Sequence, residues 1–430
     1  MQGLGSRGIL GIQYEASFGV LPTGDTPPIT ANLTKVYLET EGFKASRNLV
    51  DSAVITGVRH ASKPLLGNID VQGSLATELG TTLGMLFYGV TGSVGTVTNA
   101  NTGAEAGGTA LSPTAVTTDS TTQTMTLTMP SNVAAPVGST ITLGAAATIN
   151  AVDVSMYRFR VVKLISTTGI ICRIPAGMAP AGTGIAAVFT GANVKVGLTG
   201  GLSYTHTFKS GGILPSFVVE KGFTDIAQYF LYTGCKAGKM TLNLDPEAVQ
   251  KITFDFTGKD EAIASTSYNA AVTDLGKNSL LGSVIASVKE SGGTNDITAK
   301  LTKLDVTLDN SLDSSIYCIG GAGKRSAITE GLSKVSGTAT MIFENVTLYN
   351  KAVGGAKTDI VVVIKNGTGV GTVGNEQLTI TIPELIFKQE TPVISGDKGL
   401  MVTLAFTAFY ESGLGKTSLQ LDLLNPAMTI

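Results

Sequence analysis

The sequence is short of charge and of the side chains that most often carry out chemistry. Only 14% of its 430 residues are charged, tryptophan is absent, and histidine occurs twice, at His60 and His206. An average soluble domain has about 25% charged residues. Either partners cover much of this surface, or its exposed faces carry Thr and Ser in place of Lys and Glu. We favour the first explanation, because 43% of the residues are hydrophobic.

Other scarcities exclude whole classes of protein. The net charge of −2 leaves no basic field with which to grip nucleic acid. No apolar run approaches the ~18 residues of a membrane-spanning helix. Residues 8–12, closely followed by Glu15, are too short for the core of a signal peptide, so we expect synthesis in the cytosol. The three cysteines, Cys172, Cys235 and Cys318, are odd in number and far apart, which indicates reduced, buried thiols.

Two glycine-rich segments come near a phosphate-binding loop, and neither fits. Residues 413–417 end in Gly-Lys-Thr, but Tyr410 stands where the pattern needs its first glycine. Residues 320–325 have Cys318 at that place and are better interpreted as a loop tip. Neither histidine lies near a cysteine or a run of carboxylates at metal-ligand spacing. We predict no catalytic residue, no metal and no cofactor, and hence a protein that is not an enzyme.

What the chain does have is the composition of strands and tight turns. It contains 53 glycines and many Thr and Val residues, which favour sheets over helices. Apolar residues alternate with polar ones along 242–256 and along 378–382, which is the period of half-buried strands. Short helices are predicted at 80–88, 223–232 and 345–352, the second from the helical spacing of its apolar side chains. The predicted fold class is therefore mainly β.

Internal repetition indicates how the chain is divided. Residues 33–36, Leu-Thr-Lys-Val, recur at 301–304 as Leu-Thr-Lys-Leu, and residues 67–74 are echoed by 331–338. The spacing is nearly the same in both matches, from position 33 to position 301 in the first and from position 67 to position 331 in the second. Two matches in the same order at nearly one spacing indicate a duplication.

A chain of 430 residues is also too long for one ordinary core, so we expect two related modules and three further segments. These are an N-terminal arm at 1–32, a first module at 33–91 and 201–260, an inserted small β-domain at 92–200, a linker at 261–299 and a second module at 300–430. The second copy has only a short turn where the first has the 92–200 block, and loops accept insertions at little entropic cost. The clearest strands predicted in the block are 137–143 and 158–164.

Three segments carry a family likeness. They are Gly67–Leu79, Leu214–Ile226 with Tyr232–Lys236 after it, and the early stretch Tyr14–Gly19. Together they resemble the tail tube proteins of long-tailed bacteriophages. The resemblance covers the first module and the arm well, the second module moderately and the insertion hardly at all. It implies two tandem β-sandwich or half-barrel modules with short flanking helices, whose sheets join those of neighbouring subunits around a lumen.

The resemblance also implies a role and partners. Rings of this subunit would stack helically into a hollow tube that conducts the viral DNA into the host, with the DNA passing through the lumen without specific binding. The tube would meet tail terminator, tape measure and distal tail proteins, would contact no membrane, and would become part of the virion after assembly in the host cytoplasm. The alternative is another self-assembling β-protein, such as a surface-layer or adhesin-like module, and the missing secretion signal counts against it.

The size of the ring and the contacts between rings follow from the duplication and the loops. The resemblance implies six-membered rings for tube proteins with one module, so three two-module chains would replace six such subunits. This gives trimeric rings with pseudo-sixfold symmetry and the 92–200 block on the outer wall. The arm and two long connections, 43–66 and 309–330, are expected to join stacked rings, and the arm should be removable without unfolding the subunit. The apolar residues predicted to make these contacts are Ile12, Tyr14, Phe18, Leu49, Val50, Val54, Ile55, Ile316 and Ile319.

Overall fold

A computed structural model gives the fold of the chain. It describes residues 7–15, 17–21, 33–55, 57, 59–60, 62–93, 98–99, 115–119, 124–128, 140–143, 148–149, 152–153, 158–164, 169–173, 187–188, 194–196, 203–269, 272–277, 285–290, 295–298, 300–344, 347–371, 374–392, 400–410 and 417–426.

These residues are mainly β-structure, which confirms the predicted fold class. The first half of the chain, outside the 92–200 block, contributes β1 (Gly8–Tyr14), β2 (Thr34–Val36), β3 (Thr40–Glu41), β4 (Lys44–Val50), β5 (Leu65–Glu78), α1 (Gly84–Thr91), β6 (Thr98–Asn99), β16 (Tyr204–Lys209), β17 (Phe217–Phe223), β18 (Gln228–Leu244), β19 (Lys251–Gly258) and β20 (Asp260–Ala264). The second half contributes β21 (Ile285–Glu290), β22 (Asn295–Asp296), β23 (Leu301–Asp309), β24 (Lys334–Ile342), α3 (Thr347–Gly354), β25 (Thr358–Lys365), β26 (Gln377–Phe387), β27 (Met401–Ala408) and β28 (Gln420–Asn425).

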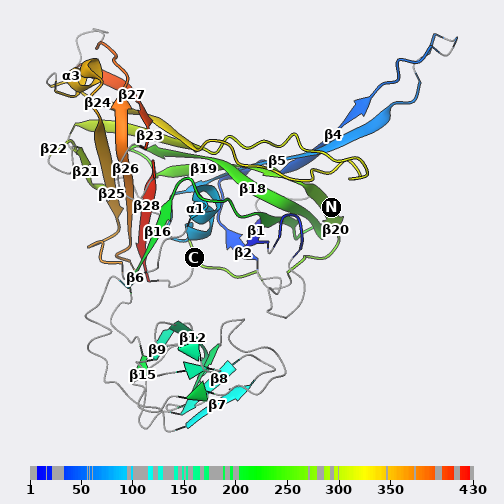
Figure 1. The fold of residues 1–430 in the computed structure, drawn as a ribbon, viewed down its shortest axis with the longest axis horizontal. Helices are drawn as coiled ribbons and strands as arrows, with labels where there is room; N and C mark the ends of the chain where they lie inside the picture. Colours follow the sequence, from blue (N-terminus) through cyan, green and yellow to red (C-terminus); the bar gives the residue numbers. More distant parts are fainter. Residues whose placement is uncertain are drawn as a thin grey trace.

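One layer of the fold is a long antiparallel sheet that runs through both halves of the chain (Figure 1). Its strand order is β4, β5, β19, β18, β23, β24, β27 and the C-terminal end of β26. Every second side chain is buried, as with Val306 and Leu308 in β23 and Leu404 and Phe406 in β27. The alternation gives this sheet one core face and one polar face, as is usual for antiparallel sheets.

A second layer packs behind the first. In the first half its strand order is β2, β1, β17, β18 and β20. The strands of the second half follow the order β21, β25, β26 and β28, and β28 pairs with β16 of the first half, which pairs with β6. β18 and β26 belong to both layers, because their N-terminal parts pair in the second layer and their C-terminal ends pair in the long sheet. These two strands therefore tie the layers together.

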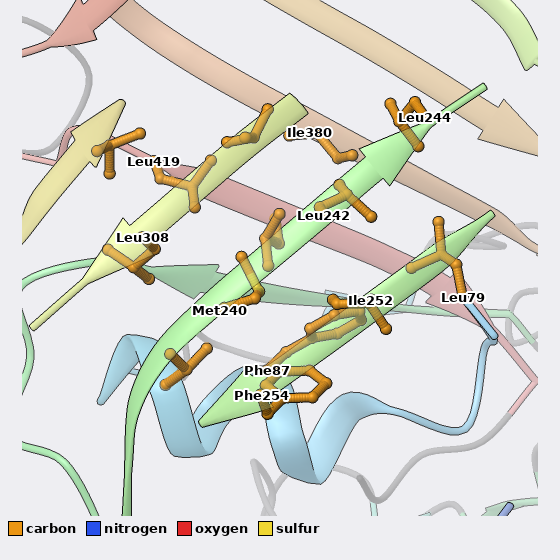
Figure 2. Close-up of a cluster of buried hydrophobic side chains, with 14 of the residues drawn as sticks. Leu79, Phe87, Met240, Leu242, Leu244, Ile252, Phe254, Leu308, Ile380 and Leu419 are labelled. Atoms are coloured by element: carbon orange, nitrogen blue, oxygen red, sulfur yellow. The ribbon is translucent and has the colours of Figure 1, made fainter. Parts of the chain in front are cut away.

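A single hydrophobic core continues from one half of the chain to the other. Figure 2 shows Phe87 of α1 beside Phe254 of β19, below the row of apolar side chains on β18. Ile380 of β26 and Leu419, just before β28, face the same row from the second half. The helix ends at Gly92, whose φ of 72° is the left-handed conformation that favours glycine. Because the core is shared, the two halves support each other.

The two halves repeat one pairing scheme in register. Gly73 of β5 lies opposite Phe256 of β19, and Gly337 of β24 lies opposite Phe406 of β27. The pair β17–β18 and the pair β25–β26 also share a register shift at the corresponding place. Positions in β5 thus correspond to positions in β24, counted from Gly73 and Gly337. Positions in β18 and β19 correspond to positions in β26 and β27, counted from Phe256 and Phe406.

Among the described residues, the strands of the 92–200 block pair with one another, except that β6 joins β16. They are β7 (Ala115–Asp119), β8 (Thr124–Thr128), β9 (Thr140–Leu143), β10 (Thr148–Ile149), β11 (Val152–Asp153), β12 (Arg158–Leu164), β13 (Gly169–Arg173), β14 (Ala187–Val188) and β15 (Val194–Val196). They form sheets in the orders β15-β9-β12-β13-β8-β7 and β11-β10-β14. The block leaves and rejoins the fold through paired strands, since Asn99 lies opposite Tyr204. The strands predicted at 137–143 and 158–164 appear as β9 and β12.

The N-terminal segment differs from its prediction. Residues 8–14 form β1, which pairs with β17 on one side and with β2 on the other. Leu10 and Ile12 are buried in consequence. The expectation of an irregular arm is therefore wrong for residues 8–14. Residues 22–32 lie outside the described residues, and removal of the arm without unfolding stays a prediction.

The predicted helix at 223–232 is a β-hairpin. β17 ends at Phe223, a turn follows, and β18 begins at Gln228. Ala227 in the turn has a φ of 50°, which excludes a continuous right-handed helix. Apolar residues recur at helical spacing here because the turn at 224–227 puts two alternating strands out of phase. The helices predicted at 80–88 and 345–352 are confirmed as α1 and α3.

Two segments expected to be irregular contain strands. Residues 43–65 include β4, which pairs with β5. The expected linker, 261–299, includes β21, which pairs with β25. The carboxylate of Glu290, at the end of β21, accepts hydrogen bonds from Lys351 and Thr358. Burial alone would raise the pKa of Glu290, but these bonds outweigh it and hold the pKa below its usual range. The end of β21 is thus fixed to the second half of the chain.

Candidate assembly surfaces

The two halves of the chain meet through an antiparallel strand pair. Residues 239–244 of β18 lie opposite residues 304–309 of β23, with Met240 facing Leu308 and Leu242 facing Val306. All four of these side chains are buried. The pair carries both the backbone hydrogen bonds and the core from one half into the other.

One edge equivalent to that of β23 and one equivalent to that of β18 remain open at the two ends of the long sheet. At one end, β3 and β4 pair with β5 alone among the described residues. At the other end, residues 386–387 of β26 pair only with β27 in the part of the chain that is described. In the repeated scheme β3 and β4 hold the place of β23, and this end of β26 holds the place of β18. Open edges are templates for pairing with another chain. The open edge at one end of the sheet can therefore pair with the open edge at the other end of a second copy.

A long hairpin extends from each half of the chain. β4 and β5 form the first, which projects at the upper right of Figure 1, and we call residues 48–66 the free hairpin. The second lies between β23 and β24, and its residues 310–331, here called the docked loop, run back along β5 (yellow in Figure 1). In the first hairpin Leu65 lies opposite Val50, and in the second Thr329 lies opposite Asp313. These two pairs hold equivalent positions, because each hairpin has one register shift between this pair and the longer run of paired residues. The hairpins are equivalent parts of the repeat, with different surroundings.

A buried arginine fastens the docked loop to the first half of the chain. Arg325 is 3% exposed. Its guanidinium donates hydrogen bonds to the carbonyl oxygens of Val71, Gly258 and Ser314 and to the carboxylate of Asp70. Partial burial would raise the pKa of Asp70, but the hydrogen bonds from Arg325 and Gln72, together with the positive charges of Arg325 and Lys44, outweigh it and lower the pKa. Buried charge is tolerated when it is paired in this way.

Other contacts extend along the docked loop. The hydroxyl of Tyr317 donates to the carbonyl oxygen of Ile69 over 2.9 Å, and the Ile69 N–H donates to the carbonyl of Gly323 over 2.7 Å. Two ion pairs flank them, Lys236 with Glu330 and Lys324 with Asp260, each with an N–O distance of 2.5 Å. The docked loop therefore joins the two halves of one chain through polar and charged groups.

Three of the residues predicted to join rings serve the subunit itself. Ile12 is buried in β1, and the Tyr14 hydroxyl donates to the carbonyl of Met85 in α1. Phe18 lies under the ammonium of Lys259, 5.4 Å from the ring centre. The turn that carries Phe18 is held by the Glu15 carboxylate, which accepts the N–H groups of Gly19 and Gly234 at 2.7 Å. Ile12 in particular offers no surface to another ring.

The other predicted residues lie on the free hairpin and the docked loop. Leu49, Val50, Val54 and Ile55 are exposed on the free hairpin, Ile55 to 95%. On the docked loop Ile319 is exposed and Ile316 is half-buried. Sequence reasoning missed Leu65 and Leu66, which lie opposite Val50 and Leu49 and are exposed as well. Two leucines just before the repeated segment at 67–74 were the available signal.

The polar face of the long sheet carries both signs of charge among many hydroxyl groups. The charged side chains at outward positions of its central strands are Lys239, Lys251, Lys303, Lys334, Asp255, Asp305 and Asp309, and they alternate with Thr and Ser. Thr340 and Thr403, on neighbouring strands, share a hydrogen bond across this face. Four lysines against three aspartates leave too small a net positive charge to bind a polyanion firmly.

The described residues contain no group of three His, Cys, Asp or Glu side chains arranged to hold a metal ion. Within the same part of the chain, no helix has the length and apolarity to span a membrane. Cys172 and Cys235 are buried as expected, and burial raises the pKa of Cys172 to about 12. Cys318 is exposed on the docked loop, so the expectation of three buried thiols is wrong for this residue.

Comparison with known families gives one match. A family model described as phage tail tube protein matches residues 5–408. The match spans both halves of the chain and the inserted block. No curated protein is similar enough to this chain to count as a match.

Proposed function

Because this chain belongs to the phage tail tube protein family, we propose that three copies close into a ring and that the rings stack into a hollow tube that conducts the viral DNA into the host. Family membership makes the chain a structural protein of the phage tail and confirms the likeness drawn from its three segments. The number of chains per ring, the stacking and the passage of DNA are our proposals.

The observation that carries the ring is the pair of complementary open edges. We propose that residues 389–392 of one copy pair with residues 43–46 of the next copy, as residues 239–242 of β18 pair with residues 306–309 of β23 inside each chain. The contact is head-to-tail, and such contacts form closed rings when the rotation per subunit divides a full turn. The internal pair β18–β23 already supplies the geometry of one such step.

The strand count gives the ring a size. The long sheet has eight strands in each chain, which at a spacing of about 4.8 Å cover about 38 Å of arc. Three chains then give a circumference of about 115 Å and a backbone diameter of about 37 Å, which strand tilt widens further. Six chains would double both dimensions. We choose three because each chain has two modules and the family resemblance implies six modules in each ring.

The polar face of the long sheet would line the lumen. Its other face is covered by the second layer and by α1, and a block as large as 92–200 directed inward would obstruct the channel. A hydroxyl-rich surface with both signs of charge suits passage of DNA without specific binding, because few phosphates would be neutralised along the way.

Contacts between stacked rings would use the tips of the free hairpin and the docked loop. We assign them to Leu49, Val50, Val54, Ile55, Ile316 and Ile319. Ile12 is left out because it is buried, and Tyr14 and Phe18 are left out because their side chains bind within the subunit. Residues 92–200 would stand on the outer wall. The ends of the tube would meet tail terminator, tape measure and distal tail proteins in a virion assembled in the host cytoplasm.

Electron microscopy of the purified full chain tests this proposal. Long hollow tubes, or stacked rings with a central hole, are the expected result. Flat lattices or discrete compact particles at the concentrations where tail proteins assemble would contradict it.

A further inference from the structure

The equivalent hairpins of the two halves have opposite surface chemistry. The docked loop meets its own chain through charged groups, Arg325, Lys324 and Glu330. The free hairpin presents apolar groups instead, Leu49, Val50, Val54, Ile55, Leu65 and Leu66, all of them exposed. A contiguous exposed apolar patch on a protein of low charge marks an interaction site.

The docked loop provides a template for what the free hairpin should touch. In the docked loop, the Glu330 carboxylate pairs with Lys236 of β18. Leu312 lies against Gly238, so closely that a Cβ on that glycine would come within 2.9 Å of the leucine. The docked loop thus packs against residues 236–238 of β18, next to residues 239–244, where β18 pairs with β23.

The register of the repeat identifies the residues that correspond to these. Leu65 opposite Val50 holds the place of Thr329 opposite Asp313, so Leu66 holds the place of Glu330. Ile386 opposite Thr407 in β26 and β27 holds the place of Lys236 opposite Thr257 in β18 and β19. The ion pair of Lys236 with Glu330 at the docked loop thus corresponds to two apolar side chains, Ile386 and Leu66, at the open end of the sheet and the free hairpin.

The receiving surface on the second half has more exposed apolar side chains than its counterpart on the first half, although Lys334 and Lys388 hold the places of Asp70 and Gly238. Ile386 is 38% exposed and Leu66 on the hairpin is 68% exposed. Leu332, which holds the place of Asn68 beside the docked loop, is exposed too. Tyr410 follows Ala408 as Asp260 follows Gly258, and it is also exposed. Lys236, Asn68 and Asp260, which lie beside the docked loop, are thus replaced by Ile386, Leu332 and Tyr410, where no loop among the described residues is docked.

We propose that the base of the free hairpin of one copy docks on the second half of the next copy in the ring, with Leu66 against Ile386, while the tip with Val54 and Ile55 remains available for the contact between rings. The occupant is a second copy of this chain, because both surfaces belong to it and the docking continues the head-to-tail joint at the open strand edges. The inference rests on the proposed ring. It adds that neighbours within a ring are locked by an apolar contact, whereas the halves of one chain are locked by a charged one.

A charge pair copied from the docked loop tests the contact. Leu66→Glu alone and Ile386→Lys alone each place an unpaired charge in the interface, and each should raise the subunit concentration needed for assembly by at least about tenfold. The double variant Leu66→Glu with Ile386→Lys recreates the Glu330–Lys236 pair between chains and should restore assembly, now weakened by salt. Ile213→Glu, at an exposed isoleucine in the loop between β16 and β17, is the matched control and should assemble like the wild type. Circular dichroism of each variant verifies that the subunit is folded.

A crosslink gives a second, independent readout. In a Cys318→Ser background, Leu66→Cys with Ile386→Cys should form a disulfide between copies and give covalent dimers and trimers on a non-reducing gel. If the wild type forms rings and Leu66→Glu assembles normally, the docking is overturned while the tube function stands. The same holds if the wild type forms rings and the double-cysteine variant gives no crosslinked trimer. A wild-type protein that forms no rings at all would overturn both.

Discussion

Arg325 should control whether the docked loop stays on the first half of the chain. Arg325→Ala removes the donors to three carbonyl groups and leaves the Asp70 carboxylate with the hydrogen bond from Gln72 but without its positively charged partner. A buried group left unsatisfied costs about 1–3 kcal/mol, and the side chain of Asp70 is half-exposed, so water replaces part of its loss. We expect a total of about 3 kcal/mol, the lower end for breaking a buried pair. This corresponds to an increase of about 150-fold in local opening.

Hydrogen exchange followed by mass spectrometry measures this opening directly. Peptides covering 310–331 and 65–72 should exchange about two orders of magnitude faster in Arg325→Ala, while peptides from β25 and β26 should not change. Lys251→Ala is the control, because the ion pair of Lys251 with Glu39 is exposed and worth under about 1 kcal/mol. Unchanged exchange in 310–331 would show that other contacts hold the docked loop and would refute the role given to Arg325.

Four further changes have defined outcomes. Gly337→Ala brings a Cβ into the carbonyl of Asp305 and the ring of Phe406, and it should lower the free energy of unfolding by about 1–3 kcal/mol in urea titrations; a neutral effect would contradict the close approach of β24 to its neighbours. The pKa of Glu290 is lowered in the fold, so the stabilisation from its carboxylate is present above the ordinary pKa of 4.5 and is lost as the pH falls through the lowered value. The difference in melting temperature between wild type and Glu290→Gln should therefore narrow below about pH 4.5. A difference that widens there would contradict this role of Glu290. Ile12→Ala should cost about 2–5 kcal/mol as a buried large-to-small change, and a melt like that of the wild type would return residues 8–14 to the status of a dispensable arm. Joining Asn99 to Tyr204 by a short Gly-rich turn should leave a folded subunit that forms thinner-walled tubes, because these two residues already lie side by side, and loss of folding would contradict an outer, dispensable block.

The repeat was visible in the sequence where a physical constraint fixed the residues. Gly73 and Gly337 sit where a strand crosses close to aromatic rings, and a side chain there would collide with them, so both copies keep glycine. The match between 33–36 and 301–304 lacks such a cause. β2 pairs with β1, whereas β23 pairs with β24 and β18, so these similar tetrapeptides do not hold equivalent places.

The parts that the sequence did not predict depend on partners far away in the chain. β1 shows little of the alternation of a half-buried strand because it is covered on both sides, and only its pairing with β17, which lies beyond the inserted block, makes it a strand. The turn between β17 and β18 gave a false helical period in the same region. The docked loop and the free hairpin look alike as turn-rich connections, and only their three-dimensional surroundings distinguish charged anchoring from apolar exposure.

The central claim is that one chain supplies two modules of a six-module ring, joined head-to-tail through its two open strand edges. Rotational analysis of end-on rings by cryo-electron microscopy tests it most directly. The account predicts threefold symmetry, with six similar modules around the lumen and three outer protrusions formed by residues 92–200. Six identical outer protrusions in each ring would mean six chains and would contradict it.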